Sequence, residues 1–194
     1  LLHQAGIKAH FVKFSPGSWK NDKEIDYAFN VAKRLGALGV TDELTEANVK
    51  RLYPFAEKHD MYAIFHTHMQ FAQPGFSYDP FFAMSKKVMA NFDSGHYFGS
   101  TGKNPCDMIR KYHDRIVSIH IKDKTGPDTQ PTPNTNQVWG QGQMPLEEVL
   151  HLIRDEKYPI FCDVELEYDI KPWSNAVKEV KTCVRYAREL LELE

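Results

Sequence analysis

The sequence has few cysteines, no long apolar run and almost no net charge, and each of these absences excludes a class of protein. Its three cysteines, Cys106, Cys162 and Cys183, are far apart and lie in apolar surroundings, which predicts buried free thiols rather than a disulfide framework or a zinc knuckle. No apolar run approaches the length that a membrane span requires, and no signal-peptide pattern is visible. The formal net charge of −2, with histidine counted as neutral, gives no electrostatic reason to expect a nucleic acid or an anionic membrane as partner.

What is present is typical of one globular domain. The 194 residues are 42% hydrophobic and 26% charged, which is enough for a sizeable core, and we expect residues 1–194 to form a single domain. The chain starts at Leu1 within a helix-like segment, so we expect further residues upstream in the full protein. Any export signal would lie there, which leaves the compartment open between cytoplasm and periplasm.

The sequence alternates six times between strand-like and helix-like segments. The strands are short apolar runs, expected at residues 7–14, 37–40, 61–65, 88–93, 116–121 and 160–164. The helices have apolar residues at helical spacing and are expected at residues 22–35 with Asp22 as cap, from Thr45 onward, and at 80–87, 105–113, 145–156 and 174–192. Residues 15–18 and the stretch after His96 read as turns, residues 124–143 read as a loop, and Pro54 is expected to bend or shorten the second helix.

Strict alternation of strands and helices predicts an α/β fold with a parallel sheet and right-handed crossovers. A doubly wound open sheet and a (β/α) barrel both fit this order. Glycine-rich phosphate fingerprints are absent at the strand-to-helix turns, which lowers the dinucleotide-binding alternative. With six units visible and a portion expected upstream, we predict a (β/α)8 TIM barrel that lacks its first two β/α units in this chain.

Four successive predicted strands end in side chains that bind metals or move protons. They supply His66 and His68, then Asp93 and His96, then His120 and Lys122, and finally Glu165 and Glu167. Active sites of parallel α/β folds lie at the carboxyl ends of the strands, so these groups are expected at one rim. Imidazole and carboxylate donors together suit Mn²⁺, Fe²⁺, Co²⁺ or Zn²⁺.

A structural explanation exists for several of these residues. His66 and His68 fit hydrogen-bonded rim histidines, Asp93 fits an ordinary turn former, and Lys122 and Asp123 fit a mutual ion pair. His120 interrupts a run of Ile and Val, where an imidazole without a partner is costly. The remaining histidines are scattered and are treated as background: His3, His10, His59, His113 and His151.

Four short motifs together resemble the xylose isomerase-like TIM-barrel superfamily, the sugar phosphate isomerase/epimerase group that also contains endonuclease IV. Asp93-Ser-Gly-His96 is similar to the family's Asp-x-x-His after the sixth strand, and residues 119–123 are similar to its seventh-strand His-x-Lys-Asp. Residues 158–165 resemble the eighth strand, which ends in a ligand Glu, and Gly140-Gln-Gly142 resembles the glycine motif before the last helix pair. The resemblance runs from the third strand to the end of the chain.

The resemblance implies one divalent metal ion, most often manganese, with Zn²⁺, Co²⁺ or Fe²⁺ as alternatives. Matched by position, its ligands are His66, Asp93, His120 and Glu165. The strand at residues 61–65 corresponds to the fifth strand of the family's barrel, and its end departs from the family pattern. Many relatives have Glu-x-His there, whereas this chain has His66-Thr67-His68. Either histidine can therefore be the ligand, and the two-glutamate proton shuttle of the ketose 3-epimerases loses one member.

The activity that the resemblance implies is a sugar isomerase or epimerase in carbohydrate metabolism, acting on a ketose, keto-sugar or inositol-type substrate through an enediolate. Glu165 is expected to be the base, with His66 or Glu167 as its counterpart. Hydroxyls or the developing oxyanion are expected to bind His68, His96 and Lys122, and the apolar face of the sugar is expected to pack on Phe71, Tyr97 and Trp139.

Three alternatives stay open on the same barrel. A metal-dependent dehydratase or lyase would share the enediolate. An endonuclease IV-like DNA-repair enzyme would need about three zinc ions and basic groups along the phosphates, which the slightly acidic chain disfavours. A sugar-binding barrel without catalysis is the third. We expect a small sugar or polyol as partner, no nucleic acid and no membrane, and either a monomer or a homo-oligomer.

Overall fold

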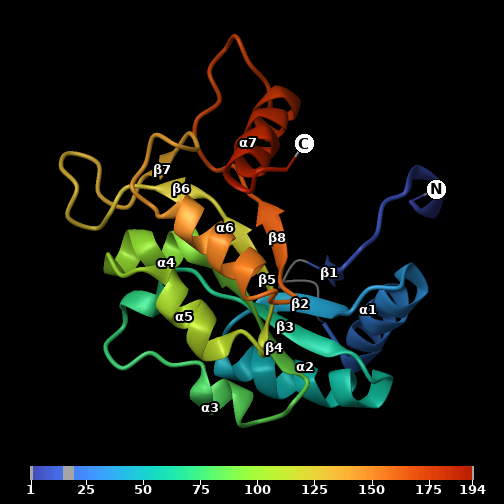
Figure 1. The fold of residues 1–194 in the computed structure, drawn as a ribbon. Coiled ribbons are helices and arrows are strands. Elements are labelled where there is room, and N and C mark those ends of the chain that lie inside the picture. The colour runs from blue at the N-terminus through green and yellow to red at the C-terminus, as the bar shows by residue number, and fades with distance from the viewer. Residues whose placement is uncertain (1, 15–19, 194) are drawn as a thin grey trace. The chain divides into compact units, whose positions relative to one another are not determined.

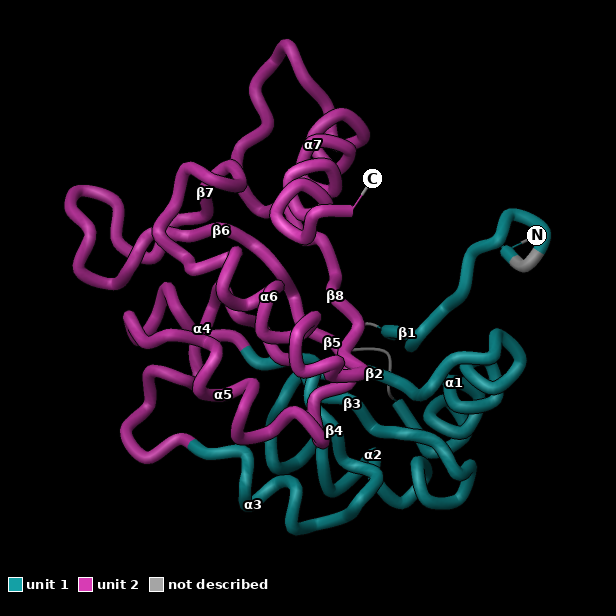
Figure 2. Tube along the Cα trace, in the orientation of Figure 1, with its two compact units in different colours: residues 1–67, 77–91 teal, residues 68–76, 92–194 magenta. Residues whose placement is uncertain are grey.

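The computed structural model describes residues 2–14 and 20–193, and the chain divides into two compact units (Figure 2). Unit 1 comprises residues 1–67 and 77–91, and unit 2 comprises residues 68–76 and 92–194. The turn expected at residues 15–18 lies outside the described residues. Among the described helices, none has the length and hydropathy needed to span a membrane.

Unit 1 is a parallel sheet with two helices packed against it (Figure 1). Its elements are η1 (His3–Ala5), β1 (Phe11–Lys13), α1 (Asp22–Leu35), β2 (Gly39–Glu43), α2 (Glu46–His59), β3 (Tyr62–His66), α3 (Asp79–Phe82) and most of β4 (Val88–Asp93). The strands pair in the order β1, β2, β3, β4, all parallel. Helices α1 and α2 lie side by side against β2 and β3, so the carboxyl ends of the strands form one edge of this unit.

Local signals explain the helix ends in unit 1. The side chain of Asn21 caps α1, one residue before the expected Asp22, and Gly36 ends the helix at a left-handed φ of 69°. Thr45 caps α2 as expected, but the helix continues to His59 through Pro54. Of the two effects expected of Pro54, bending or shortening the helix, the shortening does not occur, because the buried apolar face of α2 outweighs one missing backbone donor.

The helix expected at residues 80–87 was too long, since α3 ends at Phe82. The hydroxyl of Ser85 explains the difference. It donates to Glu57 Oε1 at 2.7 Å and accepts from the backbone N–H of Lys87 at 3.1 Å. Serine side chains that bond to nearby backbone offer the chain an alternative to the helix, and here the segment turns directly into β4.

Unit 2 contains the end of β4 and the remaining elements. These are η3 (Met69–Ala72), α4 (Ser94–Thr101), α5 (Pro105–Tyr112), β5 (Ile116–Ile121), β6 (Asp123–Lys124), β7 (Asn136–Gln137), α6 (Leu146–Asp155), β8 (Phe161–Val164) and α7 (Ala176–Leu190). Strands β5 and β8 pair in parallel with His120 opposite Asp163. The loop expected at residues 124–143 contains a short antiparallel pair, β6 with β7, and Pro145 caps α6 rather than beginning it.

Helix α4 was not expected, because Ser94 to Thr101 reads as turn-forming sequence. The carboxylate of Asp93 caps the helix by accepting from the N–H of His96 at 2.7 Å. A Cβ on Gly95 would lie 2.1 Å from Lys122 Cγ, and a Cβ on Gly99 would lie 2.2 Å from Asn134 Oδ1. The two glycines that make the sequence look like a turn are thus needed for close packing, which overrides their low helix propensity.

The three cysteines are free, as expected, but only two of them are buried. Cys106 and Cys183 are buried, whereas Cys162 is exposed. The expectation of a buried thiol was wrong for Cys162 because it lies on β8, which pairs in the described residues with β5 alone.

Candidate active site

In unit 2, the donors at the ends of β4, β5 and β8 lie within contact distance of one another. The Nδ1 atom of His120 lies 2.7 Å from Glu165 Oε2 and 3.4 Å from Asp93 Oδ2. Two hydrogen bonds to backbone carbonyls fix this arrangement: the N–H of Glu165 donates to the carbonyl of Ile121 at 3.0 Å, and Ser94 Oγ donates to the carbonyl of His120 at 2.7 Å. Three strand ends that are far apart in sequence therefore present one cluster of oxygen and nitrogen donors.

Lys122 lies in the same cluster as a resident cation. Its side chain is 2% exposed, and its Nζ atom lies 2.9 Å from Asp93 Oδ2 and 2.7 Å from Glu165 Oε2. A third salt bridge joins it to Glu167. The missing side chain of Gly95 leaves the space that the aliphatic part of Lys122 fills. The alternative that Lys122 pairs with Asp123 is wrong, because its partners are these three carboxylates.

The charges of the cluster shift the pKa values of its members. Burial alone would lower the pKa of His120, but the carboxylates of Asp93 and Glu165 outweigh it and raise that pKa to about 9. Burial would raise the pKa of Glu165, but His120 and Lys122 hold it below its ordinary value. With its pKa of about 9, His120 carries a proton near neutral pH, and a cation that binds its nitrogen would displace that proton. The three carboxylates and one ammonium would then leave two negative charges. The donor set and its charge therefore fit one divalent cation.

His96 borders this cluster as a neutral imidazole. Its Nε2 lies 3.4 Å from Lys122 Nζ and 3.7 Å from Asp93 Oδ2. Burial lowers the pKa of His96 to about 4, since the opposing charge of Asp93 is the smaller effect. The ring of His68 lies 4.9 Å from that of His96, centroid to centroid. Both histidines are placed to hydrogen-bond to a polar ligand.

His66, a residue of unit 1, has a partner that sequence reasoning missed. Its Nδ1 lies 3.3 Å from Oε2 of Glu43, and Lys13 Nζ lies 2.7 Å from the other oxygen of the same carboxylate. Burial alone would raise the pKa of Glu43, but His66 and Lys13 lower it to about 2. The available signal was the position of Glu43 at the end of its strand, which is where the candidate metal ligands were found.

A second missed feature is the buried carboxylate of Asp123. It accepts backbone N–H bonds from Gly140 at 2.9 Å, Gly142 at 2.8 Å and Met144 at 3.3 Å. A Cβ on Gly142 would lie 2.1 Å from Asp123 Oδ1, which explains the Gly-x-Gly spacing. This carboxylate, on β6, fastens the end of the 124–143 loop close in sequence to β5, the strand that carries His120.

Trp139 lies in that loop and is buried, at 6% exposed. Its indole N–H donates to the carbonyl oxygen of Glu165 at 3.4 Å, and its ring meets that of Tyr186 edge-on, with ring centroids 6.4 Å apart. The ring also lines an apolar cavity of about 320 Å³ formed by residues of β5, β8, α6 and α7. The structure thus connects Trp139 to the backbone of Glu165, and its contact with a sugar stays a prediction. Phe71 packs against Phe92 and Tyr97 in an aromatic cluster.

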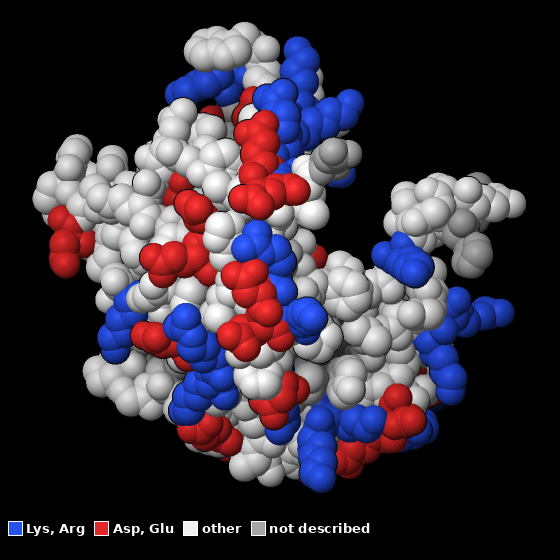
Figure 3. All heavy atoms as spheres, viewed as in Figure 1, with Lys and Arg blue, Asp and Glu red and all other residues white. Residues whose placement is uncertain are grey.

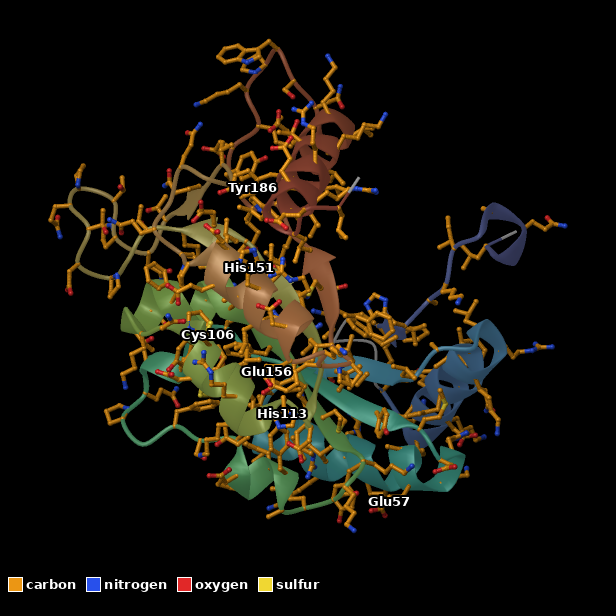
Figure 4. The ribbon with its side chains drawn as sticks, in the orientation of Figure 1. Glu57, Cys106, His113, His151, Glu156 and Tyr186 are labelled. Atoms are coloured by element: carbon orange, nitrogen blue, oxygen red, sulfur yellow. The ribbon has the colours of Figure 1, made fainter. Side chains whose placement is uncertain are left out.

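Several histidines treated as background have structural partners. His151 on α6, labelled in Figure 4, donates through Nε2 to the carbonyl of Leu190 at 2.7 Å. His113 stacks on Tyr158 with ring centroids 4.3 Å apart. His59 pairs with a carboxylate oxygen of Asp26 at 2.8 Å. These three contacts account for their positions without a catalytic role.

Comparisons with known proteins agree on the fold. A family model described as "Xylose isomerase-like TIM barrel" matches residues 2–190. A xylose isomerase domain protein from Alicyclobacillus acidocaldarius is 16% identical, with a TM-score of 0.71 over 98% of this chain and 79% of that one. A sugar phosphate isomerase/epimerase from Parabacteroides distasonis is 17% identical, with a TM-score of 0.66 over 95% and 73%.

The structure of an IolI protein with a bound zinc atom is 17% identical, with a TM-score of 0.65 over 96% of this chain and 77% of that one. No curated protein matches the sequence. At these identities the likeness concerns the fold, and it confirms the predicted α/β architecture as part of a TIM barrel.

Proposed function

The chain belongs to the xylose isomerase-like TIM barrel family, and on this premise we propose that it is a divalent-metal-dependent sugar isomerase or epimerase. The substrate would be a ketose, keto-sugar or inositol-type compound, and the reaction would pass through an enediolate. The observation that carries the proposal is the convergence of His120 with the carboxylates of Asp93 and Glu165 in unit 2. Similarity in fold to a sugar phosphate isomerase/epimerase supports the reaction class.

Asp93, His120 and Glu165 would hold the metal ion, with His66 or His68 as the further ligand that the family pattern suggests. A zinc atom is bound in the IolI structure of similar fold, and manganese is our first expectation here. When bound, a divalent ion supplies Lewis-acid stabilisation of negative charge on neighbouring substrate oxygens.

The chain's own residues would move the proton. The lowered pKa of Glu165 keeps it ionised near neutral pH, so it is our candidate base for the carbon next to the carbonyl. Glu167 or His66 would act as the counterpart of Glu165 and return a proton to the substrate. Charged Lys122 and neutral His96 would donate hydrogen bonds to the developing oxyanion or to a hydroxyl.

A small-molecule substrate also agrees with the surface. Figure 3 shows Lys and Arg side chains interleaved with Asp and Glu across the face in view, over a chain with a net charge of −2. A protein that tracks phosphates concentrates basic groups along one stripe. This mixture supports a sugar or polyol rather than a nucleic acid as the partner.

The test is proton exchange in D₂O. Manganese- or zinc-loaded protein is incubated with a panel of ketoses, keto-sugars and inososes, and deuterium at the carbon beside the carbonyl is followed by NMR. We expect exchange that requires metal and is abolished in Glu165→Gln, while Glu147→Gln on the surface of α6 keeps it. A Glu165→Gln enzyme of near-native rate would remove the assignment, and metal binding without exchange into any substrate would favour a sugar-binding barrel.

A further inference from the structure

Glu43 and His66 are direct neighbours across two parallel strands. They are register partners at the carboxyl ends of β2 and β3. The side chain of His66 is 7% exposed and that of Glu43 is 25% exposed, with Nδ1 and Oε2 3.3 Å apart. Both residues belong to unit 1, and their contact depends on strand pairing rather than on the conformation of a loop.

Backbone and side-chain contacts hold this pair from both sides. The N–H of Leu44 donates to the carbonyl of His66 at 2.8 Å, and Asn48 Nδ2 donates to the carbonyl of Glu43 at 3.0 Å. Lys13 binds Oε1 of Glu43 at 2.7 Å, so the second oxygen, Oε2, faces the imidazole. The carboxylate is therefore fixed in orientation before any ligand binds.

A fixed carboxylate selects one tautomer of a neighbouring imidazole. An ionised carboxylate only accepts hydrogen bonds, so the nitrogen facing it carries the proton and the other nitrogen keeps a lone pair. At His66 the facing nitrogen is Nδ1. The other oxygen of the Glu43 carboxylate is paired with a cation, since Lys13 Nζ lies 2.7 Å from Oε1.

We propose that Glu43 is a positioning residue that holds His66 as the Nδ1–H tautomer and presents the Nε2 lone pair. Whether that lone pair takes a proton from a substrate or binds a cation rests on the proposed function. The choice of tautomer is independent of it. Position 66 is a histidine where the family resemblance suggests a glutamate, and here the carboxylate comes from the adjacent strand and acts through the imidazole. Carboxylate–histidine pairs of this kind fix ring orientation and raise the basicity of the distal nitrogen.

The experiment is long-range ¹H–¹⁵N NMR on chelator-treated, ¹⁵N-labelled full chain at a pH where His66 is neutral. A His66→Gln variant assigns the signals. We expect a protonated Nδ1 and an unprotonated Nε2 in the native protein, and a fall in the Nδ1–H fraction in Glu43→Ala. The matched control is Glu46→Ala, which removes an exposed glutamate paired with Lys50 and should leave the His66 signals unchanged.

A native Nε2–H tautomer, or unchanged His66 signals in Glu43→Ala, would overturn the proposal. If Glu43→Ala does not fold, Glu43→Gln keeps the size of the side chain and is expected to lower the Nδ1–H fraction to a smaller extent. In the exchange assay, Glu43→Ala should lower kcat with little change in KM, since Glu43 acts through His66. An equal loss of kcat in Glu46→Ala would also contradict the proposed role of Glu43. Absence of exchange with every sugar would instead refute the proposed function and leave the NMR result standing.

Discussion

Replacing Lys122 by methionine removes the ammonium group from the cluster and keeps most of the side chain's volume. The side chain is 2% exposed and forms salt bridges with Asp93, Glu165 and Glu167. Without it, the buried carboxylate of Asp93 and the partly buried one of Glu165 share the region with His120, whose raised pKa of about 9 allows it to supply one positive charge, while Glu167 is 38% exposed. The metal-free variant therefore retains an excess of one negative charge among its buried and partly buried groups, next to the exposed carboxylate of Glu167.

The expected loss of stability follows from this geometry. Removing one partner of a buried ion pair destabilises proteins by about 3–5 kcal/mol, because the other charge stays buried. For a chain of this size, 1 kcal/mol corresponds to a change of about 2–4 °C in Tm. We therefore expect the Tm of the metal-free variant to fall by roughly 6–20 °C, measured by circular dichroism on chelator-treated protein.

A divalent ion should restore the variant. Lys122 forms salt bridges with Asp93 and Glu165, two of the residues that would hold a metal ion, so the ammonium and the metal would compete for these carboxylates. Removing the competing ammonium should strengthen manganese or zinc binding by about tenfold or more, equivalent to 1.4 kcal/mol, measured by calorimetry. The added metal should then raise the Tm of Lys122→Met more than that of the native protein.

The matched control is Lys124→Met. Lys124 is 3% exposed, yet it forms no salt bridge with a described carboxylate, so its loss should cost much less and leave metal affinity nearly unchanged. The reasoning is refuted if metal-free Lys122→Met is as stable as the native protein and binds metal with unchanged affinity.

Three further predictions concern single sites. Gly95→Ala should destabilise by about 1–3 kcal/mol despite the better helix propensity of alanine, because the new Cβ would overlap Lys122, and urea unfolding measures it. Glu43→Gln should reduce the loss of unfolding free energy at acid pH. The pKa of Glu43 is lowered from 4.5 to about 2, so its carboxylate stabilises the native protein fully above about pH 4.5 and this stabilisation is lost as pH falls toward about 2. Asp123→Asn should increase amide hydrogen exchange at Gly142, whose N–H bonds to that carboxylate.

Each of these has a control. Gly126→Ala is expected to be nearly neutral, since its nearest neighbour to a new Cβ lies 3.4 Å away. Glu46→Gln should leave the acid profile close to native, because its carboxylate is exposed. A stabilised Gly95→Ala, a Glu43→Gln profile parallel to the native one, or unchanged exchange in Asp123→Asn would each contradict the corresponding argument.

The local sequence was sufficient to predict the bounds of a strand or helix where one strong signal controls them. The strands at 88–93 and 116–121 have the bounds that their apolar runs predicted. Helix α1 covers residues 22–35 because its buried face recurs at helical spacing and Gly36 ends it. Predictions were less accurate at α3 and α4, where Ser85 and Gly95 act through packing and side-chain bonds that the local sequence does not contain.

The candidate site divides in the same way. Asp93, His120 and Glu165 were identified from their positions after apolar strands, and the structure brings them together in unit 2. Glu43 was missed because its role depends on which residue of the next strand lies opposite. The alternative that Asp123 pairs with Lys122 was wrong because the partners of Asp123, the N–H groups of Gly140, Gly142 and Met144, are brought to it by the folding of the loop.

The amino-acid sequence by itself determined the alternation of strands and helices and the chemistry carried at each strand end, because both depend on residue type and short-range spacing. Only the tertiary structure decided that Lys122 lies among three carboxylates, that Gly95 makes room for it, and that Glu43 faces His66. These contacts join residues from different strands and loops, and their energies depend on burial and distance, which exist only once the chain has folded.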